Sequence, residues 1–218
     1  SDETAPSRCR RGEAHLSRAQ RGMLRPYAFS KGLADRVRQQ REPCHYRGSA
    51  GQPRMDFVAT NPHILIVGLG NPLLRDDAVG LRVARQVRQA LVGREDVEVV
   101  EEACGGLRLM ERMVGFDRAI VIDAICSGRP PGPVRTLAPR EFPTQHSASA
   151  PDVSLPTALA FGRRSGARLP PDESLQVIAV EAQDVETFGE ELTAAVEAAV
   201  PRAAAQVLTV LDQDREAR

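Results

Sequence analysis

Between positions 64 and 211 the apolar residues follow two alternating patterns. Short apolar runs predict four strands, at 64–68, 97–100, 119–122 and 175–180. Between the runs, apolar residues recur every three or four positions, most clearly at Val79, Val83 and Val87, which predicts helices that cover a sheet. Further helices are predicted at 107–113, 153–161 and 196–211. Because strands and helices alternate, we expect a three-layer α/β/α domain around a mostly parallel sheet with right-handed crossovers.

Two regions lack these patterns. Residues 129–152 are rich in Pro, Ser and Ala, and they predict a long loop with at most a short edge strand at Val134 to Leu137. Residues 1–54 show no sustained apolar period and are predicted to be disordered. Met55 stands a few residues before the first strand, so we hypothesise that translation begins there.

Charge divides the chain at the same place. Residues 1–55 carry 12 Lys or Arg and 5 Asp or Glu, a net of +7, which leaves 17 basic and 24 acidic residues and a net of −7 for 56–218. We therefore expect a basic extension at 1–55 and a single α/β domain at 56–214. The extension is either a basic arm for nucleic acid or an acidic partner, or a non-essential tail. The absence of interleaved stacking aromatics favours the tail.

Composition indicates a soluble protein of the cytoplasm. No apolar run approaches the roughly 20 residues of a membrane span, and the N-terminus lacks the apolar stretch of a secretory signal. The four cysteines lack the spacing of a zinc site or a disulfide framework, so a reducing compartment is expected. The acidic domain also disfavours nucleic acid as a partner.

The segment VGLGNPLLRDDAVG joins the first strand to the first helix. Gly68 and Gly70 permit a tight turn that approaches whatever binds there, and with Asn71 they are the candidate ligand-contacting residues of the turn. Asp76 and Asp77 stand at the mouth of the helix, where carboxylates satisfy free N–H groups. We expect Asp76 to act as such a cap and Asp77 to be freer to point outward.

A second acid, Asp123, ends the apolar run AIVID. Open α/β folds place their sites at the carboxyl edge of the sheet, so Asp77 and Asp123 converge there if the first and third strands are neighbours. Two carboxylates in one half-buried site repel each other, and a cation between them is the economical explanation. The alternative for Asp123 is a lone solvent-facing strand end. His146 in the long loop is the candidate imidazole, whereas His63 begins the first strand at the opposite edge.

These motifs, in this order, resemble those of hydrogenase maturation proteases. The resemblance is carried by GLGNPLLRDDAVG, EACGGLRLME, AIVIDAICSG, VSLPTALAFG and VIAVEAQ, and it runs from about Ile64 to about Leu211. It implies a phosphorylase/hydrolase-like fold and an endopeptidase that removes a C-terminal extension from the nickel-loaded large-subunit precursor of a nickel-iron hydrogenase. The nickel is carried by the substrate, and zinc or cadmium would substitute in vitro.

The resemblance also implies three metal ligands: Asp77, Asp123 and a histidine just before the VSLPTAL helix. Pro151 occupies the position of that histidine, and its hydrocarbon ring offers no ligand. Either His146 takes the role through a rearranged loop, or the protein binds metal weakly and cleaves poorly.

The sequence offers no evident covalent nucleophile and no H-E-x-x-H helix. The hypothesis is that the aspartates and a loop imidazole sense the nickel, which then promotes hydrolysis by polarising the peptide carbonyl. A non-cleaving chaperone of the hydrogenase subunit is the main alternative. A peptidyl-tRNA hydrolase is disfavoured because its Thr-Arg-His-Asn run is missing, and a dinucleotide-binding module because position 73 is Leu, not the third glycine.

Overall fold

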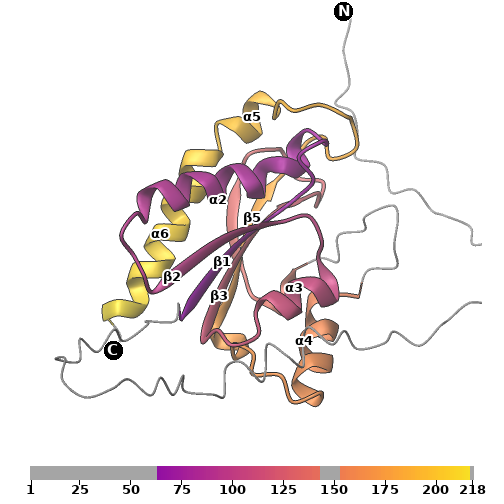
Figure 1. Ribbon diagram of the computed structural model, residues 1–218. Helices are drawn as coiled ribbons and strands as arrows, with labels where there is room; N and C mark the ends of the chain where they lie inside the picture. Colours follow the sequence, from indigo (N-terminus) through magenta and orange to yellow (C-terminus); the bar gives the residue numbers. More distant parts are fainter. Residues whose placement is uncertain (1–62, 143–152, 217–218) are drawn as a thin grey trace, which may run out of the picture. The chain divides into compact units, whose positions relative to one another are not determined.

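The computed structural model describes residues 63–142 and 153–216 of the chain. The predictions for the N-terminal extension, Met55, His146 and Pro151 lie outside these residues. Among the described segments, five strands form one sheet, and helices pack on both of its faces (Figure 1). The predicted α/β/α class is therefore confirmed.

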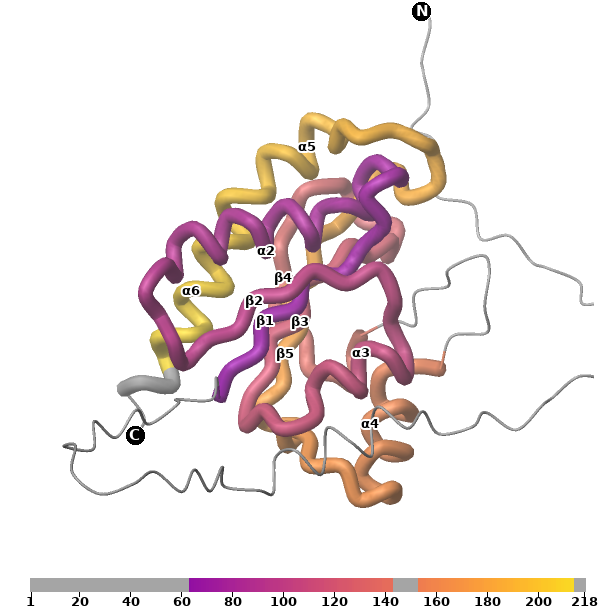
Figure 2. Tube along the Cα trace, in the orientation of Figure 1, coloured from indigo at the N-terminus to yellow at the C-terminus, as the bar shows by residue number. Residues whose placement is uncertain are grey.

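The sheet has the strand order β2-β1-β3-β5-β4 (Figure 2). The strands are β1 (Ile64–Leu69), β2 (Val97–Glu102), β3 (Arg118–Ile125), β4 (Val134–Leu137) and β5 (Leu175–Glu181). The first four in spatial order are parallel, and only β4 runs antiparallel, to β5. The predicted edge strand is thus confirmed, and so is the adjacency of the first and third strands, with Gly68 opposite Ile122.

Within residues 63–142 and 153–216, two helices cover each face of the sheet. Helices α2 (Val79–Ala90) and α6 (Val200–Glu216) pack together on one face, and α3 (Gly106–Arg112) and α4 (Leu155–Arg164) pack together on the other (Figure 1). Four shorter elements lie in the connections, namely η2 (Asp76–Ala78), η3 (Pro139–Glu141), η4 (Asp172–Ser174) and α5 (Ala194–Glu197).

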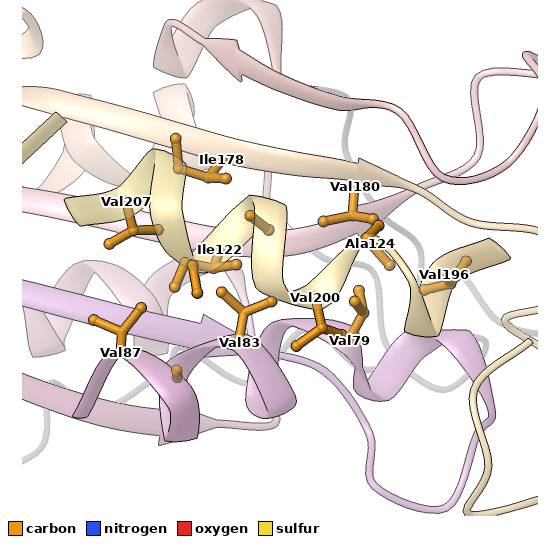
Figure 3. Close-up of a cluster of buried hydrophobic side chains, with 14 of the residues drawn as sticks. Val79, Val83, Val87, Ile122, Ala124, Ile178, Val180, Val196, Val200 and Val207 are labelled. Atoms are coloured by element: carbon orange, nitrogen blue, oxygen red, sulfur yellow. The ribbon is translucent and has the colours of Figure 1, made fainter. Parts of the chain in front are cut away.

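Branched side chains fill the layer between the sheet and the α2–α6 pair (Figure 3). Val83, Ile122, Ile178 and Val207 are all fully buried there. Each such side chain contributes about 1.5–3 kcal/mol by leaving water. This layer holds the carboxyl ends of β1, β3 and β5 in register, and those ends carry the candidate site.

The predicted last helix is divided in two. Pro201 has no N–H to donate to the carbonyl four residues earlier, so the chain forms the short helix α5 and then restarts as α6, with proline at its second position. The apolar stripe of the prediction is nevertheless present, because Val196, Ala203 and Val207 are buried against the sheet.

The stretch Ala194–Gln213 differs from the expectation that no segment resembles a membrane span. Its 20 residues are long and apolar enough to cross a membrane by length and composition, with a mean hydropathy of 1.3. However, 44% of the 18-residue window with that hydropathy is buried within the fold, and core helices of soluble proteins pass the same test of length and composition. Because Val196 of α5 and Val207 of α6 pack on the sheet, we regard both helices as part of the core.

Gly80 provides a test of the crossing between α2 and the sheet. A Cβ there would lie 2.2 Å from Leu69 O and 2.4 Å from Ile122 O, and neither backbone atom can move without disturbing its strand. We predict that Gly80→Ala lowers the free energy of unfolding in urea by about 1–3 kcal/mol. Gly105→Ala is the matched control, since nothing lies within 4 Å of a Cβ there, and it should change stability by less than about 0.5 kcal/mol. Equal stability of the two variants would contradict the close crossing.

Candidate active site

The turn after β1 runs close to the backbone that follows it. A Cβ on Gly68 would lie 2.3 Å from Gly80 O, and a Cβ on Gly70 would lie 1.9 Å from Asp77 O. Gly70 also has φ +145°, which favours glycine. The backbone that this turn approaches is therefore that of η2 and α2. Contact of Gly68 and Gly70 with a ligand stays a prediction.

Asn71 fixes the carboxylate of Asp77. The Asn71 backbone N–H donates to Asp77 Oδ2 at 2.7 Å, while the Asn71 side-chain Oδ1 accepts from the Leu73 N–H at 3.0 Å. This side-chain-to-backbone bond closes a local turn of the kind that Asn favours. Asn71 therefore orients the candidate ligand from within the same loop, and its own contact with a ligand stays a prediction.

Asp76 does not cap the helix, contrary to expectation, because no side-chain hydrogen bond is made at the start of η2 or α2. Its fully buried carboxylate instead reaches the connection between β5 and α5. Oδ1 accepts from Thr193 N at 2.7 Å, and Oδ2 accepts from Gln183 N at 3.0 Å, Asp184 N at 2.9 Å and Thr193 Oγ1 at 2.9 Å. Four donors thus satisfy one buried charge, which ties two loops together.

Asp123 lies inside β3, two residues before its end, so the prediction that it terminates the strand is wrong. Ile122 and Ala124 face the α2–α6 layer, and because side chains alternate along a strand, Asp123 faces the other layer. Its side chain is almost entirely buried, and Oδ1 accepts the N–H of Ala124 at 2.8 Å. The strand continues past Asp123 because Ile125 still pairs with Glu181 of β5.

Asp77 and Asp123 are close enough to interact through their charges. Burial raises the pKa of Asp123 well above its usual value, and the nearby Asp77 carboxylate raises it further, against the hydrogen bond from Ala124. Burial also raises the pKa of Asp77, against the hydrogen bond from Asn71. Among the described residues, Asp77 Oδ1 and Asp123 Oδ2 accept no hydrogen bond. The predicted convergence of the two acids is therefore present.

The described residues supply two candidate ligands. No group of three His, Cys, Asp or Glu side chains within 63–142 and 153–216 is placed to hold a metal ion. His63 Nδ1 is hydrogen-bonded to Asp117 Oδ2 at 3.0 Å. His63 directly precedes β1, at the opposite edge of the sheet from Asp77. The described residues therefore assign no third ligand of these types, and His146 stays a prediction.

Glu181 is a buried acid that the sequence reasoning did not single out. It ends β5, as Asp123 was expected to end β3, so an acid closing an apolar strand was the available signal. Glu181 Oε1 accepts from Ser127 N at 2.6 Å, Oε2 accepts from Ser127 Oγ at 2.7 Å, and Arg135 lies 3.3 Å away. Arg135 and the two donors of Ser127 occupy the Glu181 carboxylate. Glu181 therefore ties the segment that follows β3 to the end of β5.

Comparison with known proteins gives one family. The sequence model described as hydrogenase maturation protease matches residues 81–210. The hydrogenase 2 maturation protease of Escherichia coli is 32% identical over 152 residues, which cover 68% of this chain and 90% of that protein. The hydrogenase expression/formation protein HupD of Rhizobium leguminosarum is 30% identical, covering 69% of this chain and 74% of its own length.

The chain belongs to the hydrogenase maturation protease family.

Solved structures agree with this assignment. The hydrogenase maturating endopeptidase HybD of Escherichia coli superposes with a TM-score of 0.58 at 29% identity, over 70% of this chain and 93% of that one. A maturation protease from Thermococcus kodakarensis, at 20% identity and a TM-score of 0.53, shares the fold. This maturation protease is therefore a hydrolase, an endopeptidase.

The bonds to Asp76 predict a large effect of a small substitution. In Asp76→Asn, one carboxylate oxygen becomes an NH2 group that faces donors, so buried N–H groups lose their acceptor. We predict that the free energy of unfolding falls by about 2–4 kcal/mol, measured in urea. Asp172→Asn is the control, because that residue is an exposed acid paired with Arg163 before β5, and its change should stay within about 0.5 kcal/mol. A fully stable Asp76→Asn protein would disprove the buried contact.

The raised pKa of Asp123 predicts that Asp123→Asn increases the free energy of unfolding, whereas Asp76→Asn decreases it. An acid whose pKa is higher folded than unfolded, where it is about 3.9, holds its proton more tightly when folded. The free energy of unfolding therefore falls as pH rises above about 4. Asparagine keeps an acceptor for Ala124 N but cannot ionise. Asp123→Asn should thus be more stable than the parent at pH 7 in the presence of a chelator, and this gain should vanish near pH 4; a constant difference across that range would contradict it.

Proposed function

We propose that this chain removes the C-terminal extension from the nickel-loaded large-subunit precursor of a nickel-iron hydrogenase. Membership of the family supplies the reaction, and the chain aligns with 90% of the Escherichia coli hydrogenase 2 maturation protease. The observation that carries the proposal is the pair formed by the half-buried Asp77 carboxylate and the buried Asp123 carboxylate at the carboxyl edge of the sheet. That edge is where open α/β folds bind their ligands.

The two carboxylates fit a divalent cation. Both are raised in pKa by burial, and Asp77 opposes the ionisation of Asp123, so a positive charge between them would relieve both costs. Each also keeps one oxygen with no hydrogen bond among the described residues. Two oxygens leave most positions of a transition metal open. The arrangement therefore suits a nickel ion whose other ligands come from the precursor that carries it.

In this scheme Asp77 and Asp123 recognise the substrate through its metal. Binding the nickel would place the adjoining peptide bond at the sheet edge, which turns a diffusive encounter into a positioned one. The nickel supplies Lewis acidity toward the peptide carbonyl or its attacking water. Zinc or cadmium would occupy the same carboxylates in vitro. A precursor without nickel would lack the contact and remain uncut.

A carboxylate pair can also act without metal, as two acids that share one proton and activate water. The raised pKa values of Asp77 and Asp123 are compatible with such an aspartyl protease. The two mechanisms differ in one requirement, because only the first needs nickel in the precursor. We favour the first, since a loaded metal also explains how cleavage would wait for nickel insertion.

We further propose that the protein acts in the cytoplasm on this protein substrate, with neither nucleic acid nor membrane as a partner. Among the described residues, Cys104 is an exposed free thiol, which suits a reducing compartment. The net charge of −7 over 56–218 would repel a polyanion.

Substitution of either carboxylate tests the proposed function. We predict that Asp77→Asn and Asp123→Asn each reduce cleavage of nickel-loaded precursor at least about 100-fold, because one oxygen ligand is lost from the metal. Intact mass of the precursor before and after incubation gives the readout, and Asp172→Asn should cleave at the parental rate. Retained cleavage in both site variants would reject the carboxylate pair as the site.

The same assay decides two alternatives. If His146 is the third ligand, His146→Ala should lose cleavage as the aspartate variants do, and full activity would exclude that role. If the protein is instead a non-cleaving chaperone, the parental protein should bind the precursor and leave its mass unchanged.

A further inference from the structure

Two loops at the carboxyl edge of the sheet are joined into one unit, which we call the paired loops: residues 71–77 after β1 and 183–193 after β5 (Figure 2). Leu74 and Phe188 form an antiparallel bridge, and Gly189 N donates to Leu73 O at 3.0 Å. Arg75 N donates to Thr187 O at 3.2 Å. The buried carboxylate of Asp76 also joins the two loops, because it accepts hydrogen bonds from Asp184 N and Thr193 N of the second loop.

The paired loops expose apolar side chains that folding has not covered. Phe188 is 80% exposed and Leu73 is 58% exposed, while Leu74 is half-buried. Leu74 and Phe188 are directly paired across the bridge, and Leu73 is the preceding residue of the first loop. A phenylalanine held out on a hydrogen-bonded loop loses little conformational freedom when a partner covers it, which makes it a suitable binding anchor.

Acidic side chains surround this apolar surface. Segment 183–193 contains four acids and no Lys or Arg. Glu186, Glu190 and Glu191 are exposed, and their carboxylates make no hydrogen bond or ion pair with the described residues. The neighbouring arginines are already engaged, since Arg75 donates to Glu191 O and Arg82 to Glu190 O. An apolar centre with a charged rim is typical of a protein-binding surface.

The surface adjoins the candidate site. Leu73 lies in the loop that also carries Asn71 and Asp77, and these two are joined by a 2.7 Å hydrogen bond. A protein that brings a metal ion to Asp77 therefore comes within a few residues of the paired loops. The other two large exposed apolar residues of the described chain lie elsewhere: Val92 follows α2 near the opposite edge of the sheet, and Phe161 lies on α4.

We propose that Leu73, Leu74 and Phe188 form the docking surface for the folded hydrogenase large-subunit precursor, and that they receive an apolar side chain flanked by Lys or Arg. This proposal rests on the proposed function for the identity of the partner. The contact supplies affinity and orientation away from the metal, while Asp77 and Asp123 bind the metal itself. Glu186, Glu190 and Glu191 complement the basic residues of the partner and accelerate encounter.

Binding measured without cleavage tests the docking surface. The dissociation constant of nickel-loaded precursor is determined by calorimetry for Asp77→Asn protein, and for the same protein with Leu73→Ala and Phe188→Ala added. We expect the added pair to weaken binding roughly 10-fold or more, as loss of interface anchors does. Val92→Ala in the same background is the matched control and should leave the constant unchanged. Thermal unfolding should be the same for all of these proteins, because each truncated side chain is exposed.

The outcomes separate the two proposals. An unchanged dissociation constant for the Leu73→Ala, Phe188→Ala protein, or an equal loss with Val92→Ala, overturns the docking surface. Failure of the parental protein to cut the precursor while Phe188 still controls binding overturns the protease function alone. In a second arm, replacing the three glutamates with glutamine should make binding less sensitive to salt; an unchanged salt dependence overturns the charged rim.

Discussion

The carboxylate of Asp76 and the four donors around it hold this site together. The donors belong to Gln183, Asp184 and Thr193, in a loop more than 100 positions away along the chain, so one buried side chain joins the turn after β1 to the connection after β5. Such a charge is costly to bury unless its acceptors are filled, and here they are. The bridge between Leu74 and Phe188 joins the same two loops a second time.

The acids around the site therefore affect the stability of the fold in opposite ways. Asp76 stabilises the fold because four donors satisfy its carboxylate. By contrast, burial raises the pKa of the half-buried Asp77 and of Asp123, and the Asp77 carboxylate raises the pKa of Asp123 further. A protein that only had to fold would not keep the second pair. Their retention is explained if a cation arrives with the substrate, because the unfavourable electrostatics of the empty site then become favourable binding energy.

Much of this was predictable from local pattern. Buried strands read as short apolar runs, and the spacing of Val79, Val83 and Val87 gave the helix that covers them. The convergence of Asp77 and Asp123 followed from one rule, that neighbouring parallel strands present their carboxyl ends at one edge. The resemblance to maturation proteases rested on several motifs in order, and the comparisons confirmed it.

The sequence was a poor guide where the structure depends on contacts between residues far apart along the chain. Asp76 looked like a helix cap because its true partners lie in another loop, and no spacing rule links them. The sequence also did not indicate that the missing side chain of Gly68 makes room for Gly80 of α2, and contact of Gly68 with a ligand stays a prediction. Asp123 lies within its strand because Ile125 still pairs with β5, and Pro201 divided a helix whose apolar stripe runs on unbroken. The exposure of Phe188 depends on the folded loops and has no signature in the sequence.

The most direct test of the central claim is X-ray absorption at the nickel edge of a precursor variant that is bound but cannot be cut. Spectra would be recorded for the precursor alone, with the parental protease, and with a protease carrying Asp77→Asn and Asp123→Asn together. The account predicts additional oxygen ligands on nickel with the parental protease and none with the double variant. Identical nickel coordination in all three samples, despite demonstrated binding, would contradict it.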